Sequence, residues 1–350
     1  MSPYRSRTIN RRGFLALGSG ALLTLAGCAS SDDTDATTVG ALPTAAPDKS
    51  TTLRLGVATT QAQLAAEPSL GPVPFRTEWV RLNGGPETIQ GFRAGAVDLA
   101  SNAGMPPIQA HDIGVEARIV AISHNTAVNY IPTTRPGSDI RTAKDVVGKK
   151  IGFSQGQAQG VTILKWLKEN GISYKDVELV PLPSAQFLTA LQGKQVDLAP
   201  LTEPALTKYL EQYEKDGARA LPTDVQDLLS LLWAPTSVLA DDQKAAAVRA
   251  FIPIWVKGNN WSWENPEEWI ESYYVKDQGI SKEDGQRIVQ ARSKPLYPTN
   301  WDSSIAWEQS IADLMSGAGF VKEFDVSVLF DRRFEHIAAE AAAAEYRGQA

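Results

Sequence analysis

Runs of alternating apolar and polar residues, each followed by a turn, recur through the first two thirds of the chain. The runs at 53–58, 77–82 and 97–100 predict strands, because apolar residues at every second position fit one buried face of a sheet. Between the second and third strands, 87–94 predicts a short helix that a glycine ends. The stretch 59–74 is interrupted by proline and glycine, so we expect no regular element there.

The same order of elements returns about a hundred residues later. The letters GAVDLA at 95–100 are echoed by GKQVDLA at 193–199. We interpret the repeat as two βαβαβ lobes of the α/β class, each a parallel sheet covered by helices. The second lobe has predicted strands at 150–154, 177–182 and 196–199, and predicted helices at 161–169 and 185–191.

The last third of the chain has the periodicity of helices rather than strands. Four tryptophans in this region have roughly helical spacings, which is more typical of core packing than of ligand contact. These residues are Trp255, Trp261, Trp263 and Trp269. The predicted helices span 241–255, 266–274, 281–292 and 304–316.

The N-terminus has the pattern of an export signal. Residues 1–27 join a basic start to an apolar core that is too short to span a membrane, which predicts a signal peptide. The letters NRRGFL at 10–15 resemble the twin-arginine export motif, and LAGC at 25–28 resembles a lipobox. The lipobox predicts lipidation of Cys28, the only cysteine in the chain. An N-terminal membrane anchor that stays uncleaved is the alternative.

A polar segment separates this signal from the folded body. Residues 28–50 are rich in Ser, Thr, Asp, Ala and Pro without apolar periodicity, which predicts a lipidated, flexible tether. No later stretch approaches the length of a membrane span. We therefore expect an exported protein that is lipid-anchored at the cell membrane and faces the outside or the periplasm.

Composition excludes several classes of function. The formal net charge is −6 with no basic run beyond the N-terminus, so nucleic acid is not an expected partner. A single cysteine allows no internal disulfide and no multi-cysteine zinc site. The histidines His111, His124 and His336 lack metal-ligand spacing, so we expect neither a metal nor a cofactor, although His124 follows an apolar run that predicts a strand end. No nucleophile stands beside a general base and no phosphate loop is present, which argues against an enzyme.

Several stretches resemble one family. They are LRLGV at 53–57, GGPE at 84–87, FRAGAVDLA at 92–100, DVVGKKIGF at 145–153, LKENGISYKDVELV at 167–180 and LQGKQVDLA at 191–199. Together they resemble the substrate-binding proteins of ABC importers for aliphatic sulfonates, taurine and nitrate. The resemblance covers roughly 53–240 and extends only loosely into the helical last third.

The resemblance implies a type II periplasmic-binding-protein fold, in which two lobes joined by a two-strand hinge close over a ligand. The crossovers are expected near 128–133 and 231–238. It also implies a small sulfonate-like ligand, and a permease and an ATPase as partners. The expected segments are 51–130 with 237–335 for the first lobe, 131–236 for the second lobe, and 336–350 for a tail.

Ligands of open α/β sheets bind beyond the carboxyl ends of the strands, so the loops there supply the candidate site. These loops are polar and contain glycine, but no Lys or Arg, which suits a sulfonate held by neutral donors and helix N-termini. Two of them depart from the family pattern, at 102–107 and 201–204, so the substrate does not transfer with the scaffold. The candidate ligand-binding residues are Thr60, Gln61, Gly85, Asn102, Met105, Ser154, Gln155, Gln157, Thr202 and Glu203.

Two questions about the ligand stay open at this stage. Glu203 either pairs with an amine on the ligand or begins a helix and complements its dipole. Met105 would give an apolar wall, which favours an organic ligand over nitrate. The alternative function is an enzyme or a sensory lipoprotein on the same fold, related to the thiamine-pyrimidine proteins.

Overall fold

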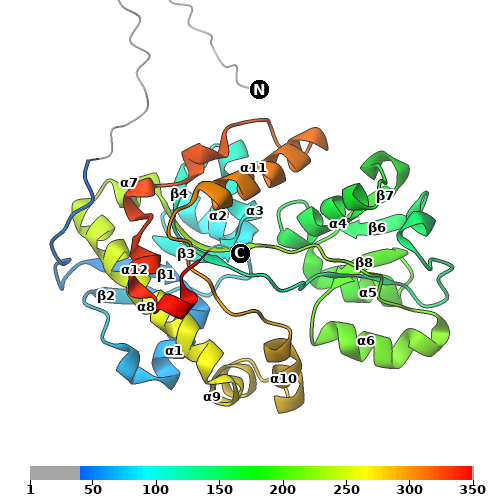
Figure 1. Cartoon of the computed structure of the whole chain (residues 1–350), viewed down its shortest axis with the longest axis horizontal. Coiled ribbons are helices and arrows are strands. Elements are labelled where there is room, and N and C mark those ends of the chain that lie inside the picture. The colour runs from blue at the N-terminus through cyan, green and yellow to red at the C-terminus, as the bar shows by residue number, and fades with distance from the viewer. Residues whose placement is uncertain (1–39, 349–350) are drawn as a thin grey trace, which may run out of the picture. The chain divides into compact units, whose positions relative to one another are not determined.

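The folded body consists of two α/β lobes, each built around its own sheet (Figure 1). The computed structural model describes residues 40–348, so the predicted signal peptide and Cys28 lie outside the described residues. The end of the predicted tether, 40–50, contacts the first lobe: Arg249 donates to the carbonyl oxygen of Thr44, and Gln243 accepts from the Asp48 N–H.

The first lobe has a five-stranded sheet in the order β2-β1-β3-β9-β4. Strand β1 pairs in parallel with β2 and β3, whereas β9 runs antiparallel to both of its neighbours. The sheet is therefore mixed, not wholly parallel as the sequence predicted. The strands are β1 (Thr52–Gly56), β2 (Arg76–Trp79), β3 (Leu99–Ala103), β4 (Ala117–His124) and β9 (Leu229–Pro235).

The second lobe has a four-stranded sheet in the order β5-β8-β6-β7. Strand β6 pairs in parallel with β7 and β8, and β5 runs antiparallel to β8 at one edge. Each lobe thus combines a parallel unit with one strand of opposite direction. The strands are β5 (Ile131–Thr134), β6 (Lys150–Phe153), β7 (Glu178–Pro181) and β8 (Leu198–Leu201).

The repeated VDLA letters have the same structural role in both lobes. The carboxylate of Asp98 accepts from the Arg54 N–H at 2.8 Å, and that of Asp197 accepts from the Lys150 N–H at 2.9 Å. Each aspartate thereby joins the last strand of its unit to the first strand, and an arginine pairs with the same carboxylate. The sequence echo therefore marks two equivalent positions of one supersecondary unit.

The chain crosses between the lobes twice. The first crossover follows β4 and enters β5 at Ile131, close to the predicted 128–133. The second lies before β9, so the predicted crossover at 231–238 falls in β9 up to Pro235 and in the helix that follows, α7 (Thr236–Leu239). The physical reason is that β9 is paired on both sides, and Leu231, Leu232 and Trp233 are fully buried. The chain thus re-enters the first lobe at Leu229, before the predicted position 237.

Helices cover both sheets, and those of the last third return to the first lobe (Figure 1). With the second lobe lie α4 (Ala158–Glu169), α5 (Phe187–Gln192) and α6 (Ala205–Tyr213). With the first lobe lie α1 (Ala58–Ala66), α2 (Gly85–Arg93), α3 (Met105–Asp112), α7 (Thr236–Leu239), α8 (Asp242–Glu264), α9 (Pro266–Trp269), a π-helix (Ile270–Asp277), α10 (Lys282–Gln290), α11 (Asp302–Gly317) and α12 (Ile337–Ala341).

Helix α8 is the longest element and shows why the last third belongs to the first lobe. The carboxylate of Asp241 accepts from two N–H groups of the first turn, as expected of an N-cap. Three of the four tryptophans, Trp255, Trp261 and Trp269, are buried, which agrees with core packing. Trp263 keeps part of its surface exposed.

The C-terminal segment packs on α8 instead of forming a free tail. Ala338 and Ala339 of α12 are buried, and Tyr346 donates a hydrogen bond from its hydroxyl to Glu264. Residues up to Tyr346 therefore contribute to the core of the first lobe, although the sequence assigned 336–350 to a tail.

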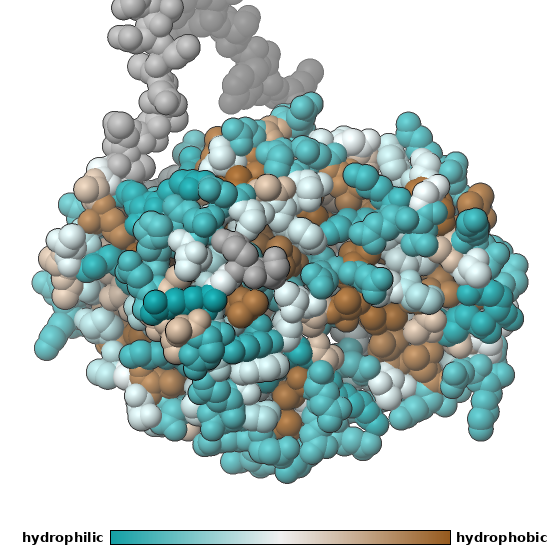
Figure 2. All heavy atoms as spheres, in the orientation of Figure 1, coloured by the Kyte–Doolittle hydropathy of each residue, from teal (hydrophilic) through white to brown (hydrophobic). Residues whose placement is uncertain are grey.

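The surface seen in Figure 2 is mostly hydrophilic, and its largest hydrophobic group lies over the second lobe beside the border with the first. Within residues 40–348, no helix combines the length and the apolarity that a membrane crossing requires.

Candidate functional site

A groove of about 530 Å³ separates the two lobes and is lined by both. From the first lobe it receives the start of α2 with Asn83 and Glu87, and Gln109 of α3. From the second lobe it receives the loop 153–157 between β6 and α4, and the segment 181–185 after β7. We call this space the inter-lobe groove. Apart from Gln109, its walls are segments at strand ends, which is where open α/β sheets bind ligands.

Four of the predicted site residues meet at this groove. Ser154, Gln155 and Gln157 line it, and a Cβ on Gly85 would lie 3.5 Å from the carbonyl oxygen of Gly156 across the gap. Gln155 also bridges the lobes, because its Nε2 donates to the carbonyl oxygen of Phe320 at 3.1 Å. The side chains of Ser154 and Gln157 are hydrogen-bonded to each other, so the loop is ordered before any ligand arrives.

The other six predicted residues lie elsewhere and line neither this groove nor the second pocket described below. Thr60 is fully buried in α1, next to Gln61, and Met105 is 2 % exposed at the start of α3. Asn102 accepts from the indole N–H of Trp233 at 2.8 Å, inside the first lobe. Thr202 and Glu203 stand after β8 at the entrance to α6.

Glu203 has a local partner. Its carboxylate accepts from the Thr207 hydroxyl at 2.8 Å and from the Thr207 N–H at 3.4 Å, one turn along α6. This is the geometry of an acidic residue that satisfies the first turn of a helix, and it supports the helix-start interpretation over the pairing with a ligand amine.

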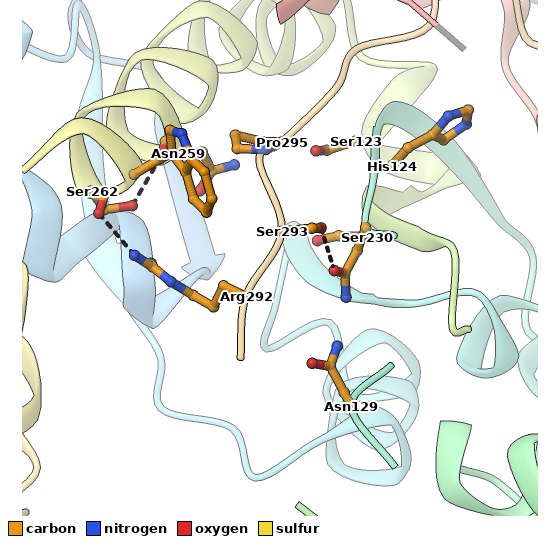
Figure 3. Close-up of a pocket in the computed structure, with 11 residues that line it drawn as sticks. Ser123, His124, Asn129, Ser230, Asn259, Ser262, Arg292, Ser293 and Pro295 are labelled. Carbon is orange, nitrogen blue, oxygen red and sulfur yellow. Dashed lines mark hydrogen bonds between the residues drawn. The ribbon is translucent and has the colours of Figure 1, made fainter. Parts of the chain in front are cut away.

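A second pocket lies where the first crossover leaves the first lobe (Figure 3). It has a volume of about 220 Å³, and we call it the hinge pocket. Four segments form it. They are the ends of β4 and β9 with Ser123, His124 and Ser230; the crossover residues Asn125 and Asn129; the last turns of α8 with Asn259, Ser262 and Trp263; and the segment after α10 with Arg292, Ser293 and Pro295.

Hydrogen bonds tie these segments together. Ser293 donates to Oδ1 of Asn125 at 2.8 Å and accepts from the Thr126 N–H at 2.9 Å, which holds the segment after α10 against the crossover. The guanidinium of Arg292 donates to the carbonyl oxygen of Ser262 at 3.0 Å, and in Figure 3 it points toward the end of α8. Hydrogen bonds to neighbouring segments thus fix the positions of several side chains that line the pocket.

Sequence reasoning missed Arg292. It follows a helix of the last third instead of a strand, and no motif surrounds it. Its position depends on the return of the C-terminal helices to the first lobe, which the local pattern does not reveal. Burial lowers the pKa of Arg292 below its usual range, with a small opposing effect from Tyr274.

His124 stands at the edge of the hinge pocket, at the strand end that the sequence predicted. Its Nε2 lies 2.8 Å from the Ser304 hydroxyl of α11, and burial lowers its pKa to about 4. The imidazole is therefore neutral at physiological pH. Residues 40–348 contain no group of His, Cys, Asp and Glu side chains arranged to hold a metal ion.

Two carboxyl groups, one fully buried and one partly exposed, influence each other near the second crossover. Glu308 of α11 is fully buried, and neither carboxyl oxygen has a hydrogen-bond partner among the described residues. Burial raises the pKa of Glu308 to about 8, and the charge of Asp227 contributes to this shift. Burial likewise raises the pKa of Asp227, to about 7. Asp227 belongs to the second crossover and is within the electrostatic reach of Lys165 in α4.

Contacts across the border between the lobes surround these groups. The Lys165 ammonium lies 3.6 Å from the centre of the Trp307 ring, a cation–π contact between α4 and α11. On the other side, Lys208 of α6 pairs with Asp284 of α10, and Arg287 lies 3.5 Å from Glu211. The lobes therefore touch at two edges, as in a closed arrangement.

Comparison with known proteins identifies relatives of this architecture. A profile of the family described as "NMT1/THI5 like" matches residues 80–269, more than half of the chain. A protein of Bacillus subtilis that carries the provisional name of aliphatic sulfonates-binding protein is 24% identical over 263 residues, covering 74% of this chain and 77% of that protein. One of the same provisional name from Escherichia coli is 26% identical over 146 residues, covering 42% of this chain and 45% of its own length.

Solved structures establish the fold. The crystal structure of the periplasmic aliphatic sulphonate binding protein SsuA from Escherichia coli superposes with a TM-score of 0.69 at 21% identity. The superposition covers 80% of this chain and 92% of that one. The predicted periplasmic-binding-protein fold is confirmed by this likeness, and so is the resemblance on which it rested.

Proposed function

Because the chain belongs to the NMT1/THI5 like family, we propose that it is the solute-binding protein of an ABC importer. It captures a small organic anion, such as an alkanesulfonate or taurine, between its lobes. The observation that carries the proposal is the inter-lobe groove, whose walls include the segments that follow β2 and β7 at corresponding places in the two lobes. The names of the sulfonate-binding relatives support the choice of ligand class.

The mechanism follows from two lobes that share one ligand. Contacts made by both lobes favour the closed arrangement, so the ligand shifts the population toward it. The closed form is the conformation that docks on the permease of the importer, which its ATPase drives. The chemistry needed is binding only, and the function requires no bond to be made or broken.

The N-terminus supplies the location in this proposal. A twin-arginine signal peptide exports the protein, and lipidation of Cys28 anchors it to the membrane facing the outside or the periplasm. The predicted tether, 28–50, then joins the lipid to the body. Its described end contacts the first lobe from Gly40, whose carbonyl oxygen accepts from Arg333.

Thermal unfolding of the purified protein tests the ligand class. We expect alkanesulfonates or taurine to raise the unfolding temperature, because a ligand at about a hundred times its dissociation constant adds about 2.7 kcal/mol to the stability. Benzenesulfonate, nitrate and an aminopyrimidine are the comparison ligands. Stabilisation by the aminopyrimidine alone, or by none of the anions, would contradict the proposed ligand.

A further inference from the structure

The hinge pocket holds a cationic side chain that has no counterion. Arg292 makes no ion pair with any described residue, and its buried Nε has no hydrogen-bond partner. Within the described residues, its guanidinium donates one hydrogen bond, to the carbonyl oxygen of Ser262. No Asp or Glu lines the pocket. A charge taken partly out of water without a partner costs free energy, which an anion in the pocket would offset.

The remaining polar groups of the pocket are neutral, but the hydroxyls of Ser262 and Ser293 already donate, to the carbonyl oxygen of Asn259 and to Oδ1 of Asn125. The hydroxyls of Ser123 and Ser230 remain available to donate to a ligand. Four serine hydroxyls and three asparagine amides line it, from the strand ends, the crossover and α8. Asn125 accepts from Ser293 with its Oδ1, so its NH₂ group is the part left to donate. In Figure 3, the Arg292 guanidinium points toward Ser262 at the end of α8, and Ser123, Ser230 and Ser293 lie on the other side of the segment that carries Arg292.

We infer that the hinge pocket is the subsite that holds the oxyanion head of the ligand, with Arg292 as its counterion. The inference rests on the proposed function and makes it specific. One guanidinium surrounded by neutral donors matches a singly charged head group, such as a sulfonate, a carboxylate or nitrate, better than a phosphate dianion. Trp263 and Pro295 provide an apolar wall for the first carbons of an organic anion.

The origin of the lining residues sets the order of events. All of them belong to the first lobe or to the first crossover, and none comes from the body of the second lobe. The head group therefore binds the first lobe in the open form. The volume of about 220 Å³ holds a small head group and leaves larger substituents outside the pocket.

The test compares wild type with Arg292→Gln and Arg292→Lys by calorimetric titration with ethanesulfonate, propionate and nitrate. We expect Arg292→Gln to lower the affinity for the most tightly bound of these anions at least tenfold. The affinity of Arg292→Lys should lie between those of Arg292→Gln and wild type, because an ammonium keeps the charge but lacks the planar arrangement of donors. The matched control is Arg249→Gln. Arg249 also has a buried Nε without a partner, but it lies on α8 outside both cavities. The Arg249→Gln variant should therefore bind the anions with the affinity of wild type.

Stability without ligand separates a binding role from a structural one. If the guanidinium has no counterion until a ligand binds, the ligand-free Arg292→Gln variant should unfold at the same temperature as wild type or at a higher one. A lower unfolding temperature with unchanged affinity would mean that Arg292 only caps α8, and the inference would be wrong while the proposed function stands. If wild type binds none of the three anions, the proposed ligand class fails, and the subsite falls with it.

Discussion

Replacement of Glu308 by glutamine is expected to stabilise the protein by a few kcal/mol near pH 8 and to change little near pH 4. Glu308 is fully buried, and its carboxyl oxygens have no partner in the described part of the chain. A Cβ on Gly104 would lie against this carboxyl group, so the side chain fills the space beside the first turn of α3. Pro106 and Pro107 of that turn have no N–H to offer it.

The sign follows from the raised pKa. Burial raises the pKa of Glu308 from 4.5 to about 8 in the folded protein. Between these two values the unfolded chain releases a proton that the folded protein keeps, so the free energy of unfolding falls by about 1.4 kcal/mol per pH unit as the pH rises. The loss begins above about pH 4.5 and levels off above about pH 8. Glutamine does not ionise and removes this term.

Urea unfolding of wild type and Glu308→Gln across this pH range measures the effect. The difference in unfolding free energy should grow with pH and then become constant. Glu340→Gln is the matched control, because Glu340 is exposed on α12 and its replacement should leave the pH profile unchanged. A wild-type stability that is flat between about pH 5 and pH 8 would show that Glu308 ionises normally or has a partner.

Replacement of Gly156 by valine should weaken ligand binding by up to about tenfold, because the added side chain must displace the end of the Gln109 side chain, at a cost of about 1 kcal/mol. Gly156 stands at a close contact between the lobes. A Cβ there would lie only 2.1 Å from Oε1 of Gln109 on the opposite lobe, and 2.8 Å from its Cδ. The larger side chain keeps the lobes apart, and the closed form loses free energy relative to the open form.

A second substitution provides the rescue. In Gly156→Val combined with Gln109→Ala, the opposing side chain is gone and most of the affinity should return, which a double-mutant cycle quantifies by calorimetric titration. Gly317→Ala is the control, since a Cβ at that position meets nothing within 4 Å. Wild-type affinity in Gly156→Val would show that the ligand does not need this closed contact.

The sequence predicted the repeated unit because its signals are local. Strand periodicity, glycine stops and the two VDLA echoes identify the elements of both lobes, and Asp98 and Asp197 then show why the echo exists. The family resemblance supplied the fold, which the solved structures confirm. Each of these signals lies within a few residues of the element that it predicts.

The elements that escaped prediction depend on context. Helix α1 at Ala58–Ala66 contains no proline or glycine, but the prolines that follow made the whole stretch resemble a loop. The first turn of helix α3 contains Pro106 and Pro107, which indicate a turn in sequence but are well suited to the first turn of a helix. Strand β9 lay beyond the repeat, so nothing local showed that it returns to the first sheet.

For the same reason, only four of the ten predicted ligand-binding residues lie at the inter-lobe groove. The loop at 154–157 follows a predicted strand, and the rule about strand ends placed it in the groove. Arg292 and Glu308 come from the helical last third and reach the crossovers only through tertiary packing. Glu308 lies on the buried face of α11 with Ile311 and Met315, a face that a helical pattern assigns to apolar residues.

The central claim is that a small organic anion binds between the two lobes, and hydrogen exchange of the amides with and without ethanesulfonate tests it most directly. The account predicts slower exchange in the loop 153–157, at the start of α2, and in the segment 292–296 that carries Arg292, with little change at the far edges of both sheets. Slower exchange confined to the outer surface of one lobe, with these three segments unchanged, would contradict it.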